Sequence, residues 1–392
     1  MSKAKEHPWN RVHCLATSWP VAIPLMALIV ASLACGPVTP PPSTPLPPPT
    51  STPLPPTNTP APSPTAPPAP AGGQSGGFRG GGQAEPAAEG VLTPENVAGI
   101  TELLSGVADE TAVLAAAFSP ISHDAATFGV DTIVRIWDLD TGNLRYEMPG
   151  HTAPGFALSY SPDGLMLASG ADDYRVRIWN ALTGDLIHTV LVNAQVFRVI
   201  WSHDSSVFGV VGSGSSRIEL FDSASGEKIV DLQPSDRVLW SAAFAPDSSL
   251  IGTADNQGTV SVYAVDTLEL IMQDSTTASG AGWDLEFSPD GSLLASCHDG
   301  GGVYVWETVN MTPVLGGVVY PGDCVDGVFS SDGRLYFSAG DDGWVYAWDT
   351  FSGDELAEIN LGARIWTLSM SGDGMYIAAA MDDGTLRVLG LP

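Results

Sequence analysis

The sequence repeats one short pattern seven times at a nearly constant interval. One position of each repeat, which we call the anchor, holds a large and usually aromatic side chain: Trp137, Trp179, Phe221, Tyr263, Trp306, Trp348 and Leu389. The steps between successive anchors are 42, 42, 42, 43, 42 and 41 residues. A chain that keeps this register must build one structural unit again and again, so its fold has to consist of equivalent units.

The residues beside each anchor indicate a β-strand. Apolar residues lie three and one positions before it, as Val134 and Ile136 do before Trp137, and the intervening residue is usually polar or amphipathic, as is Arg135. A period of two is the pattern of a strand whose successive side chains point to opposite faces. The anchor lies on the face opposite to the apolar pair, so we expect both faces of the strand to be covered. A repeat of about 40–45 residues is typical of a propeller blade.

Two further series run in phase with the anchors and indicate turns. One is rich in Ser, Pro, Asp and Gly, as in Ser161-Pro162-Asp163-Gly164, and the other places a Gly after the anchor, as in Thr141-Gly142. Pro fixes φ, Asp supplies a side-chain acceptor and Gly tolerates positive φ, which together form hairpin turns. Each unit therefore reads as four strands joined by turns.

In these residues the chain resembles the WD-repeat β-propeller family. Trp137-Asp138 and Trp348-Asp349 match the dipeptide that gives the family its name, and Gly150-His151 matches its Gly-His. The resemblance implies an all-β, seven-bladed propeller over residues 91–392. A β-sandwich is the alternative, but it offers no reason for seven anchors in step.

The seventh unit is one strand short. Its anchor, Leu389, lies three residues before the last residue of the sequence. Upstream of the first anchor, Ile100–Ser105 occupies the place that a fourth-strand segment such as Asn143–Met148 has in other units. We expect this segment to be the outermost strand of the last blade, because the family closes its ring in this way and a closed ring has no cut edge.

Residues 1–35 resemble an export signal that ends in a bacterial lipoprotein lipobox. A basic start precedes an apolar run over 19–30 that prolines interrupt and that is short for a spanning helix. Ala34 and Cys35 match the lipobox, which implies lipidation of Cys35, whereas Ser32 stands where that family usually has Leu. Simple signal cleavage and an uncleaved anchor are the alternatives. Each reading predicts an exported protein on the extracellular or periplasmic side of a membrane.

Residues 36–90 predict a disordered linker. The segment is rich in Pro, Thr and Ser and then in Gly, and such a composition cannot bury a core. It reads as a stalk or spacer that carries the propeller. The chain as a whole has 44 acidic and 15 basic side chains and a net charge of −29. Because such a surface repels phosphate backbones, we expect no nucleic-acid partner, and solubility is the simplest reason for the charge.

The family resemblance also implies a buried hydrogen-bonded set inside a blade. It joins a His, a Ser or Thr, an Asp and the anchor Trp, and the second unit carries it complete as His151, Ser169, Asp173 and Trp179. A buried polar network is tolerated only when its members are satisfied, so we assign these residues a structural role. Cys297 and Cys324 are predicted on the same rim of neighbouring blades. A disulfide and two buried thiols are both open for them.

The start of the first strand in each unit gives a candidate binding rim. Counting back from the aromatic residue near the end of that strand finds large aromatics in five units and charged residues in three. Aromatics with a few charges suit a peptide or a small ligand, whereas aromatics at one repeated position also suit packing between blades. Two carboxylates make a weak metal site, so we predict no metal and no other cofactor. The candidate rim residues are Arg198, Trp240, Trp283, Asp284, Asp323, Asp326, Arg364 and Trp366.

Catalytic motifs are missing from the sequence. It contains no His-Glu-x-x-His, no paired Cys-x-x-Cys and no phosphate-binding loop, and the Ser/Gly segment 212–216 lies between predicted strands rather than before a helix. We therefore predict a non-enzymatic, monomeric scaffold at the cell surface or in the periplasm, which binds protein partners and is held to the membrane by a lipid. A small-ligand or ion sensor that uses the central rim is the alternative, and a propeller hydrolase is less favoured.

Overall fold

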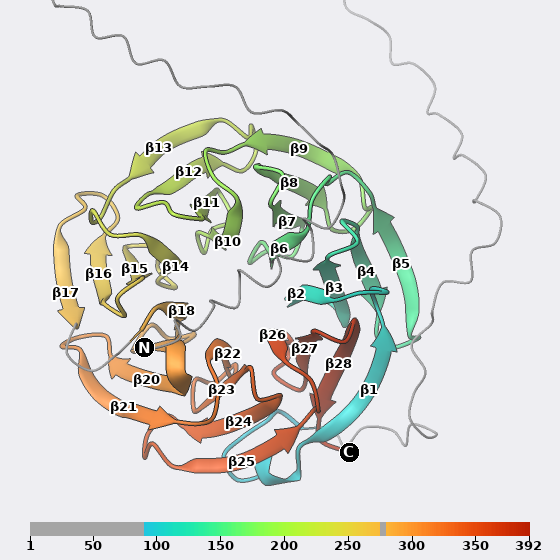
Figure 1. The fold of residues 1–392 in the computed structure, drawn as a ribbon, viewed down its shortest axis with the longest axis vertical. Coiled ribbons are helices and arrows are strands. Elements are labelled where there is room, and N and C mark those ends of the chain that lie inside the picture. Colours follow the sequence, from blue (N-terminus) through green and yellow to red (C-terminus); the bar gives the residue numbers. More distant parts are fainter. Residues whose placement is uncertain (1–89, 275–279) are drawn as a thin grey trace, which may run out of the picture. The chain divides into compact units, whose positions relative to one another are not determined.

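The computed structural model describes residues 90–274 and 280–392. Within these ranges the chain forms seven four-stranded antiparallel sheets arranged as blades around a centre (Figure 1). The predicted all-β, seven-bladed propeller is confirmed. Helical structure in the described ranges is limited to the short 3₁₀ segments η1 (Val97–Gly99) and η2 (Asp299–Gly301), and no helix there is long and apolar enough to cross a membrane.

The first strands of neighbouring blades contact one another around the centre, and in blades 1 to 6 the other strands follow outwards in sequence order. Blades 1 to 3 are β2 (Val113–Phe118), β3 (Asp124–Gly129), β4 (Val134–Asp138) and β5 (Asn143–Met148); β6 (Gly155–Tyr160), β7 (Met166–Ala171), β8 (Arg175–Asn180) and β9 (Leu186–Leu191); β10 (Val196–Trp201), β11 (Val207–Gly212), β12 (Ile218–Asp222) and β13 (Lys228–Leu232).

Blades 4 to 6 are β14 (Leu239–Phe244), β15 (Leu250–Asp255), β16 (Val260–Ala264) and β17 (Leu270–Asp274); β18 (Gly282–Phe287), β19 (Leu293–His298), β20 (Gly302–Glu307) and β21 (Thr312–Val319); β22 (Cys324–Phe329), β23 (Leu335–Gly340), β24 (Trp344–Asp349) and β25 (Glu355–Asn360). Blade 7 contains β26 (Ile365–Met370), β27 (Ile377–Met381) and β28 (Thr385–Gly390), and β1 (Thr101–Val107) is its fourth strand.

The ring closes through this last pairing. Strand β1 runs antiparallel to β28, with Ser105 opposite Arg387 and Glu102 opposite Leu389. The predicted closing strand is confirmed, although it begins one residue later than expected and extends to Val107. The outermost strand of the last blade therefore comes from the N-terminal side of the propeller, and the other three come from its C-terminal end (Figure 1).

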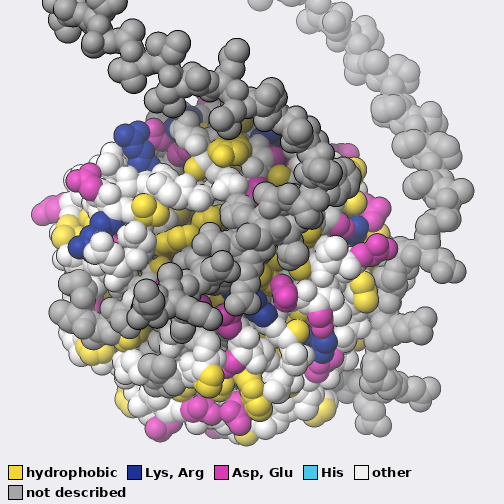
Figure 2. All heavy atoms as spheres, in the orientation of Figure 1, with side chains coloured by type: hydrophobic (Ala, Val, Ile, Leu, Met, Phe, Trp, Pro, Cys, Tyr) yellow, Lys and Arg dark blue, Asp and Glu magenta, His cyan; other side chains and the backbone are white. Residues whose placement is uncertain are grey.

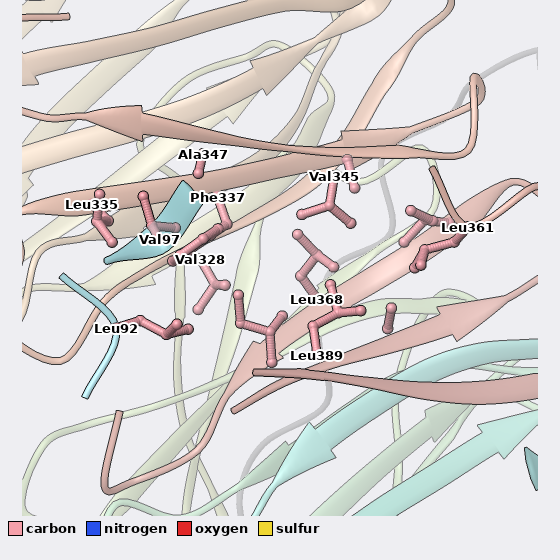
Figure 3. Close-up of a cluster of buried hydrophobic side chains, with 14 of the residues drawn as sticks. Leu92, Val97, Val328, Leu335, Phe337, Val345, Ala347, Leu361, Leu368 and Leu389 are labelled. Carbon is pink, nitrogen blue, oxygen red and sulfur yellow. The ribbon is translucent and has the colours of Figure 1, made fainter. Parts of the chain in front are cut away.

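The segment before β1 is fixed to blades 6 and 7. Leu92 and Val97 are fully buried in a cluster with residues such as Phe337 and Leu389 (Figure 3). The Leu92 N–H donates to the Gly374 carbonyl oxygen at 3.0 Å. The chain thus enters the propeller through an apolar seal that lies next to the closing strand.

The core is a set of seven apolar layers, one between each pair of neighbouring blades. The anchor Trp179 packs in the layer between blades 1 and 2, whereas Val176 and Ile178 pack in the layer between blades 2 and 3. The two-sided pattern read from the sequence therefore has a direct cause. Each third strand lies between two layers and has to be apolar on both faces.

The second repeat forms the turns between the first and second strands. Ser161 Oγ donates to Asp163 Oδ1 at 2.6 Å and accepts from the Met166 N–H at 3.0 Å, while Gly164 adopts a φ of +71°. A side chain thus replaces a backbone partner at each tight turn. The same Ser and Asp bonds recur in four further blades, at Ser202, Ser288, Ser330 and Ser371.

Candidate functional site

Every first strand carries a β-bulge near its start. In blade 3, Val196 lies opposite Gly212 and Arg198 lies opposite Val211, so Phe197 is an extra residue in the ladder. A bulge turns a side chain away from its ordinary direction, and the bulged positions are those at which the sequence showed repeated aromatics. The seven bulged residues are Leu114, Phe156, Phe197, Trp240, Trp283, Val325 and Trp366.

The residue after each bulge lines a cavity in the centre of the ring. This central channel has a volume of about 400 Å³ and is lined by the first strands of all seven blades. At this position the wall carries alanine in blades 1 and 2 and polar side chains in blades 3 to 7. The residues that follow the bulges are Ala115, Ala157, Arg198, Ser241, Asp284, Asp326 and Thr367.

Arg198 joins two carboxylates in this channel. Its Nη2 donates to Asp284 Oδ1 at 2.5 Å and to Asp326 Oδ1 at 2.7 Å, so the ion cluster links blade 3 to blades 5 and 6. The other oxygens are also used, since Asp284 Oδ2 accepts from the Gly327 N–H at 3.1 Å and Asp326 Oδ2 accepts from the Leu368 N–H at 2.7 Å. The guanidinium therefore takes the place at which the sequence left open a bound cation.

Glu286 adds a third carboxyl group to the channel. It lies two residues after Asp284 on β18, and its Oε2 accepts from the Phe329 N–H at 2.8 Å. Burial, and then the nearby Asp284 charge, raise the pKa of Glu286 well above its ordinary value, and the same two causes raise the pKa of Asp326 to about 7. The described lining thus sets three carboxyl groups against one guanidinium.

Ser241 lies in the ring between Arg198 and Asp284. Its side chain is 1% exposed, and its hydroxyl has no hydrogen-bond partner among the residues that the structure describes. The equivalent Thr367 hydroxyl accepts from the Ala116 N–H of the next blade at 2.8 Å. A buried hydroxyl without a partner is costly, so its presence on a cavity wall is a feature to explain.

The rim aromatics pack against one another from blade to blade. Ring centroids lie 6.1 Å apart for Phe156 and Phe197, 5.2 Å for Phe197 and Trp240, and 4.8 Å for Trp240 and Trp283. Trp283 Nε1 also donates to Asp299 Oδ1 at 2.5 Å. These contacts give the aromatic side chains of blades 2 to 5 a packing role, which is one of the two interpretations that the sequence allowed.

The remaining rim residues have partners within the chain. The Arg364 guanidinium carbon lies 3.8 Å from the centroid of the Trp366 ring, and Arg364 Nε lies 3.0 Å from Asp341 Oδ1. Trp366 Nε1 donates to Asp382 Oδ1 at 3.0 Å. Asp323 Oδ1, in turn, accepts from the Gly300 N–H at 2.7 Å. Of the rim residues predicted from sequence, the structure brings together Arg198, Asp284 and Asp326 in one cluster.

The set predicted in blade 2 forms one buried network. Trp179 Nε1 donates to Ser169 Oγ at 2.8 Å, His151 Nε2 lies 2.8 Å from the same oxygen, and His151 Nδ1 lies 3.1 Å from the Asp173 carboxylate. Burial lowers the pKa of His151. Burial works to raise the pKa of Asp173, but the interactions with His151, the Thr152 N–H and Arg177 together outweigh it and hold that pKa at about 2. Sequence reasoning missed Arg177, which donates to Asp173 at 3.1 Å.

Cys297 and Cys324 form a disulfide, with their Cα atoms 5.0 Å apart. It joins β19 of blade 5 to β22 of blade 6, which the sequence left open. Cys297 is the register partner of Asp284, and Cys324 lies two residues before Asp326, so the bridge lies directly behind the ion cluster. A bridged Cys297 offers no thiolate to the adjacent His298, whose pKa burial lowers to about 4.

The described residues give no support to a metal site, and they do not include the predicted lipid site. Across residues 90–274 and 280–392, no group of three or more His, Cys, Asp or Glu side chains is placed to hold a metal ion. The Ser/Gly segment 212–216 connects β11 to β12, without a helix after it. The predicted signal, Cys35 and the linker lie outside the described residues.

Comparison with known proteins identifies the repeat. The sequence model of the family described as "WD domain, G-beta repeat" matches residues 142–180, 277–307, 320–349 and 358–388. In these four segments the chain matches WD repeats. The matched segments include most of blade 2 and of blades 5, 6 and 7, and the match at 320–349 ends in Trp348-Asp349.

Three curated proteins that are similar to parts of this chain come from a yeast, a plant and a filamentous fungus. WD repeat-containing protein slp1 of Schizosaccharomyces pombe is 31% identical over 36% of this chain and 30% of its own length. WD repeat-containing protein VIP3 of Arabidopsis thaliana is 27% identical over 42% of this chain and 57% of its own length. Small ribosomal subunit protein RACK1 of Neurospora crassa is 27% identical over 33% and 40%. The chain thus spans 30% to 57% of the length of these relatives.

Proposed function

We propose that this protein is a non-enzymatic scaffold that holds another protein against its propeller, outside the cytoplasm and at a membrane. WD-repeat propellers generally serve as scaffolds for protein interaction. Two similar proteins carry the names of parts of larger assemblies, a small ribosomal subunit protein and an anaphase-promoting complex subunit. For this chain the proposal rests on one surface of its own.

That surface is an apolar belt on the outer strands of blades 2, 3 and 4. Ile187 on β9, Ile229 on β13 and Ile271 on β17 each lie eight residues after their anchor and are 42%, 54% and 46% exposed. These strands follow one another around the rim of the ring (Figure 1). Further exposed aliphatic side chains on the same three strands are Leu186, Leu191, Val230 and Leu270.

An outer strand of this kind needs cover. It has an unpaired edge, and soluble proteins usually blunt such edges with charges, bulges or prolines. Blade 1 follows that rule, since Arg145 occupies the equivalent position and pairs with Asp124 at 2.9 Å. Three consecutive blades carry isoleucine instead, and exposed aliphatic side chains repeated on neighbouring blades are typical of a protein contact.

The net charge of the molecule indicates what kind of partner it can bind. With a net charge of −29, the chain repels acidic proteins and attracts basic ones. On the face shown in Figure 2, Asp and Glu side chains are spread around the margin rather than gathered in one patch. The partner we propose therefore has an apolar contact surface with a basic rim.

The setting of the scaffold rests on the sequence. The basic and apolar segment before Cys35 supports export and lipidation, and the Pro-rich segment 36–90 supports a stalk. Mass spectrometry of the mature N-terminus, compared with a Cys35→Ser chain, tests both parts. We expect a diacylated Cys35 as the first residue, and a chain that begins at another residue contradicts the lipid anchor.

The scaffold is tested by cross-linking tagged full-length protein on intact cells and quantifying the proteins that co-purify. A belt variant carries Ile187→Ser, Ile229→Ser and Ile271→Ser. A matched control changes three other exposed apolar residues, Leu182→Ser, Val309→Ser and Phe351→Ser, which lie on turns. We expect a partner in near-stoichiometric yield that the belt variant loses and the control retains. Equal yields from both variants, or loss in the control alone, contradict the proposal.

A small-ligand sensor is the second candidate function. The observation that favours it is the central channel, where a cavity of about 400 Å³ has a polar wall that includes the unpartnered Ser241 hydroxyl. A volume of this order is common for small-molecule sites. A hydrolase has less support, because the carboxyl groups of the channel are bonded to Arg198 or to backbone N–H groups.

A further inference from the structure

We propose that the central channel binds a small organic ammonium ligand, with its cationic nitrogen at Glu286 and Ser241 and its alkyl part against the alanine wall of blades 1 and 2. This inference rests on the second candidate function and is independent of the scaffold. The ligand class is that of a primary amine with a short aliphatic chain.

The first argument is charge. Arg198 supplies one positive charge to a described lining that contains Asp284, Asp326 and Glu286. The guanidinium contacts both aspartates, whereas the bond recorded at Glu286 comes from a neutral donor, the Phe329 N–H. The buried Tyr336 also lies close to the three carboxyl groups and adds no positive charge. A second cation in the channel would therefore stabilise the cluster.

The second argument is the hydroxyl of Ser241. It is buried on β14, next to the β18 strand that carries Glu286, and both residues line the channel. Within the part of the chain that the structure describes, its oxygen bonds to nothing. An ammonium group has three donors and no acceptor, so it suits a wall that offers a carboxylate and a hydroxyl.

The third argument separates an organic cation from a metal ion. A metal ion takes several oxygen ligands at once, but the oxygens of Asp284 and Asp326 are already engaged by Arg198 and by backbone N–H groups. The opposite wall is mostly apolar, with Ala115, Ala117 and Leu158, and also contains Ser159. A channel with one acidic wall and one methyl-lined wall matches a ligand with a cationic end and an aliphatic body.

The site is tested by calorimetry on the full-length chain with three probes of one size. We expect butylammonium to give a saturable heat at pH 7.5, and butanol and butyrate to give none. Glu286→Gln should weaken butylammonium binding at least about tenfold, because a charge-assisted bond is replaced by a neutral one while the Phe329 contact is kept. Ser241→Ala should weaken it less. Glu227→Gln, an exposed control, should leave it unchanged.

The pH dependence gives a second readout. Glu286 faces Asp284 on its own strand, Asp326 on β22, Arg198 on β10 and Tyr336 on β23, and its raised pKa keeps it protonated below that pKa. An ammonium ligand favours the ionised form, so binding should release protons and tighten as the pH rises through that pKa. Glu286→Gln should remove the part of this dependence that comes from Glu286, whereas the part that comes from Asp326, with its pKa of about 7, should remain.

Three outcomes overturn the inference: no saturable heat with butylammonium, equal affinity for butanol, or wild-type affinity in Glu286→Gln. None of these outcomes bears on the scaffold proposal, which is tested by the amount of partner that co-purifies with the belt variant and with its control. Equal partner yields from the belt variant and its control, with butylammonium binding intact, would overturn the scaffold and leave the channel site supported.

Discussion

At the scale of single residues, Arg198 holds the ion cluster of the channel together. One guanidinium, 26% exposed, reaches carboxylates on two other blades that lie 86 and 128 residues away along the chain. Burial of an ion pair is costly, and this cluster offsets the cost by placing further N–H donors on both aspartates. The result is a polar tie across the centre of a ring that otherwise relies on apolar layers.

Arg198→Met tests that tie. Removal of the cation leaves two buried carboxylates without a counter-charge, and we expect a loss of about 3–5 kcal/mol in the free energy of unfolding at pH 7.5. The loss should shrink near pH 5, because the raised pKa of Asp326 lets that carboxyl group become neutral. Urea unfolding at both pH values measures this. Arg217→Met, at an exposed ion pair of 3.8 Å, should cost under about 1 kcal/mol; equal losses for the two variants contradict the argument.

His123 gives a second residue-scale prediction, at the junction of blades 7 and 1. Its ring nitrogens lie 2.9 Å from Asp140 and 2.9 Å from Asp373, and hydrogen bonding to Asp140 raises its pKa above the ordinary value of 6.5. A raised folded-state pKa means that the stabilisation is complete below the unfolded-state pKa and is lost as the pH rises through the folded-state pKa. His123→Asn should therefore lower the melting temperature by roughly 1–2 °C at pH 5.5 and by nothing measurable at pH 9. A constant difference across this range would point to packing instead of charge.

The residue scale also shows where sequence reasoning stops. Counting back from a repeated aromatic found the rim positions of Arg198, Asp284 and Asp326, because the repeat is regular. It did not reveal the bulge, since an extra residue in a ladder is defined by the partner strand. Nor did it show that the arginine pairs with both aspartates, which depends on the diameter of the ring.

At the scale of elements, the disulfide fastens blade 5 to blade 6. It closes a segment with a sequence separation of 27 residues, for which chain entropy predicts a stabilisation of about 3–4 kcal/mol. The double variant Cys297→Ser, Cys324→Ser should lose that amount in urea unfolding. A reductant should lower the wild-type midpoint to that of the variant and leave the variant itself unchanged. Alkylation of both cysteines in the unreduced, unfolded wild type would show that no bridge had formed.

Elements were the part of the fold most open to prediction. The Ser and Asp of the turn series bond to each other within two residues, so local sequence alone carries their role. The closing strand β1 was found by elimination, because the last unit lacked a fourth strand. The belt on β9, β13 and β17 was missed, although its isoleucines recur eight residues after three successive anchors.

At the scale of the whole molecule, the ring has two kinds of junction. In blades 2 to 5 aromatic side chains in contact bridge the first strands. From blade 5 through blades 6 and 7 to blade 1, side chains accept hydrogen bonds from backbone N–H groups of the next first strand. These bonds are Asp284 to Gly327, Glu286 to Phe329, Asp326 to Leu368, Thr367 to Ala116 and Ser369 to Phe118. The half with polar junctions contains the closure of the ring, where the first strand of the propeller, β1, pairs with its last strand, β28.

Closure is therefore the step on which the whole ring depends, and two truncated chains test it. A chain of residues 90–392 keeps β1 and the seal of Leu92 and Val97, so it should unfold at the same urea concentration as the full-length protein. A chain of residues 108–392 loses that seal and the β1 partner of β28, and we expect it to lose at least about 5 kcal/mol, since each fully buried aliphatic side chain contributes about 2–3 kcal/mol. Hydrogen exchange should then be fastest at Thr385–Gly390. A peptide of residues 90–107, added back, should restore protection there. If the shorter chain unfolds at the wild-type midpoint, the ring holds without its closing strand.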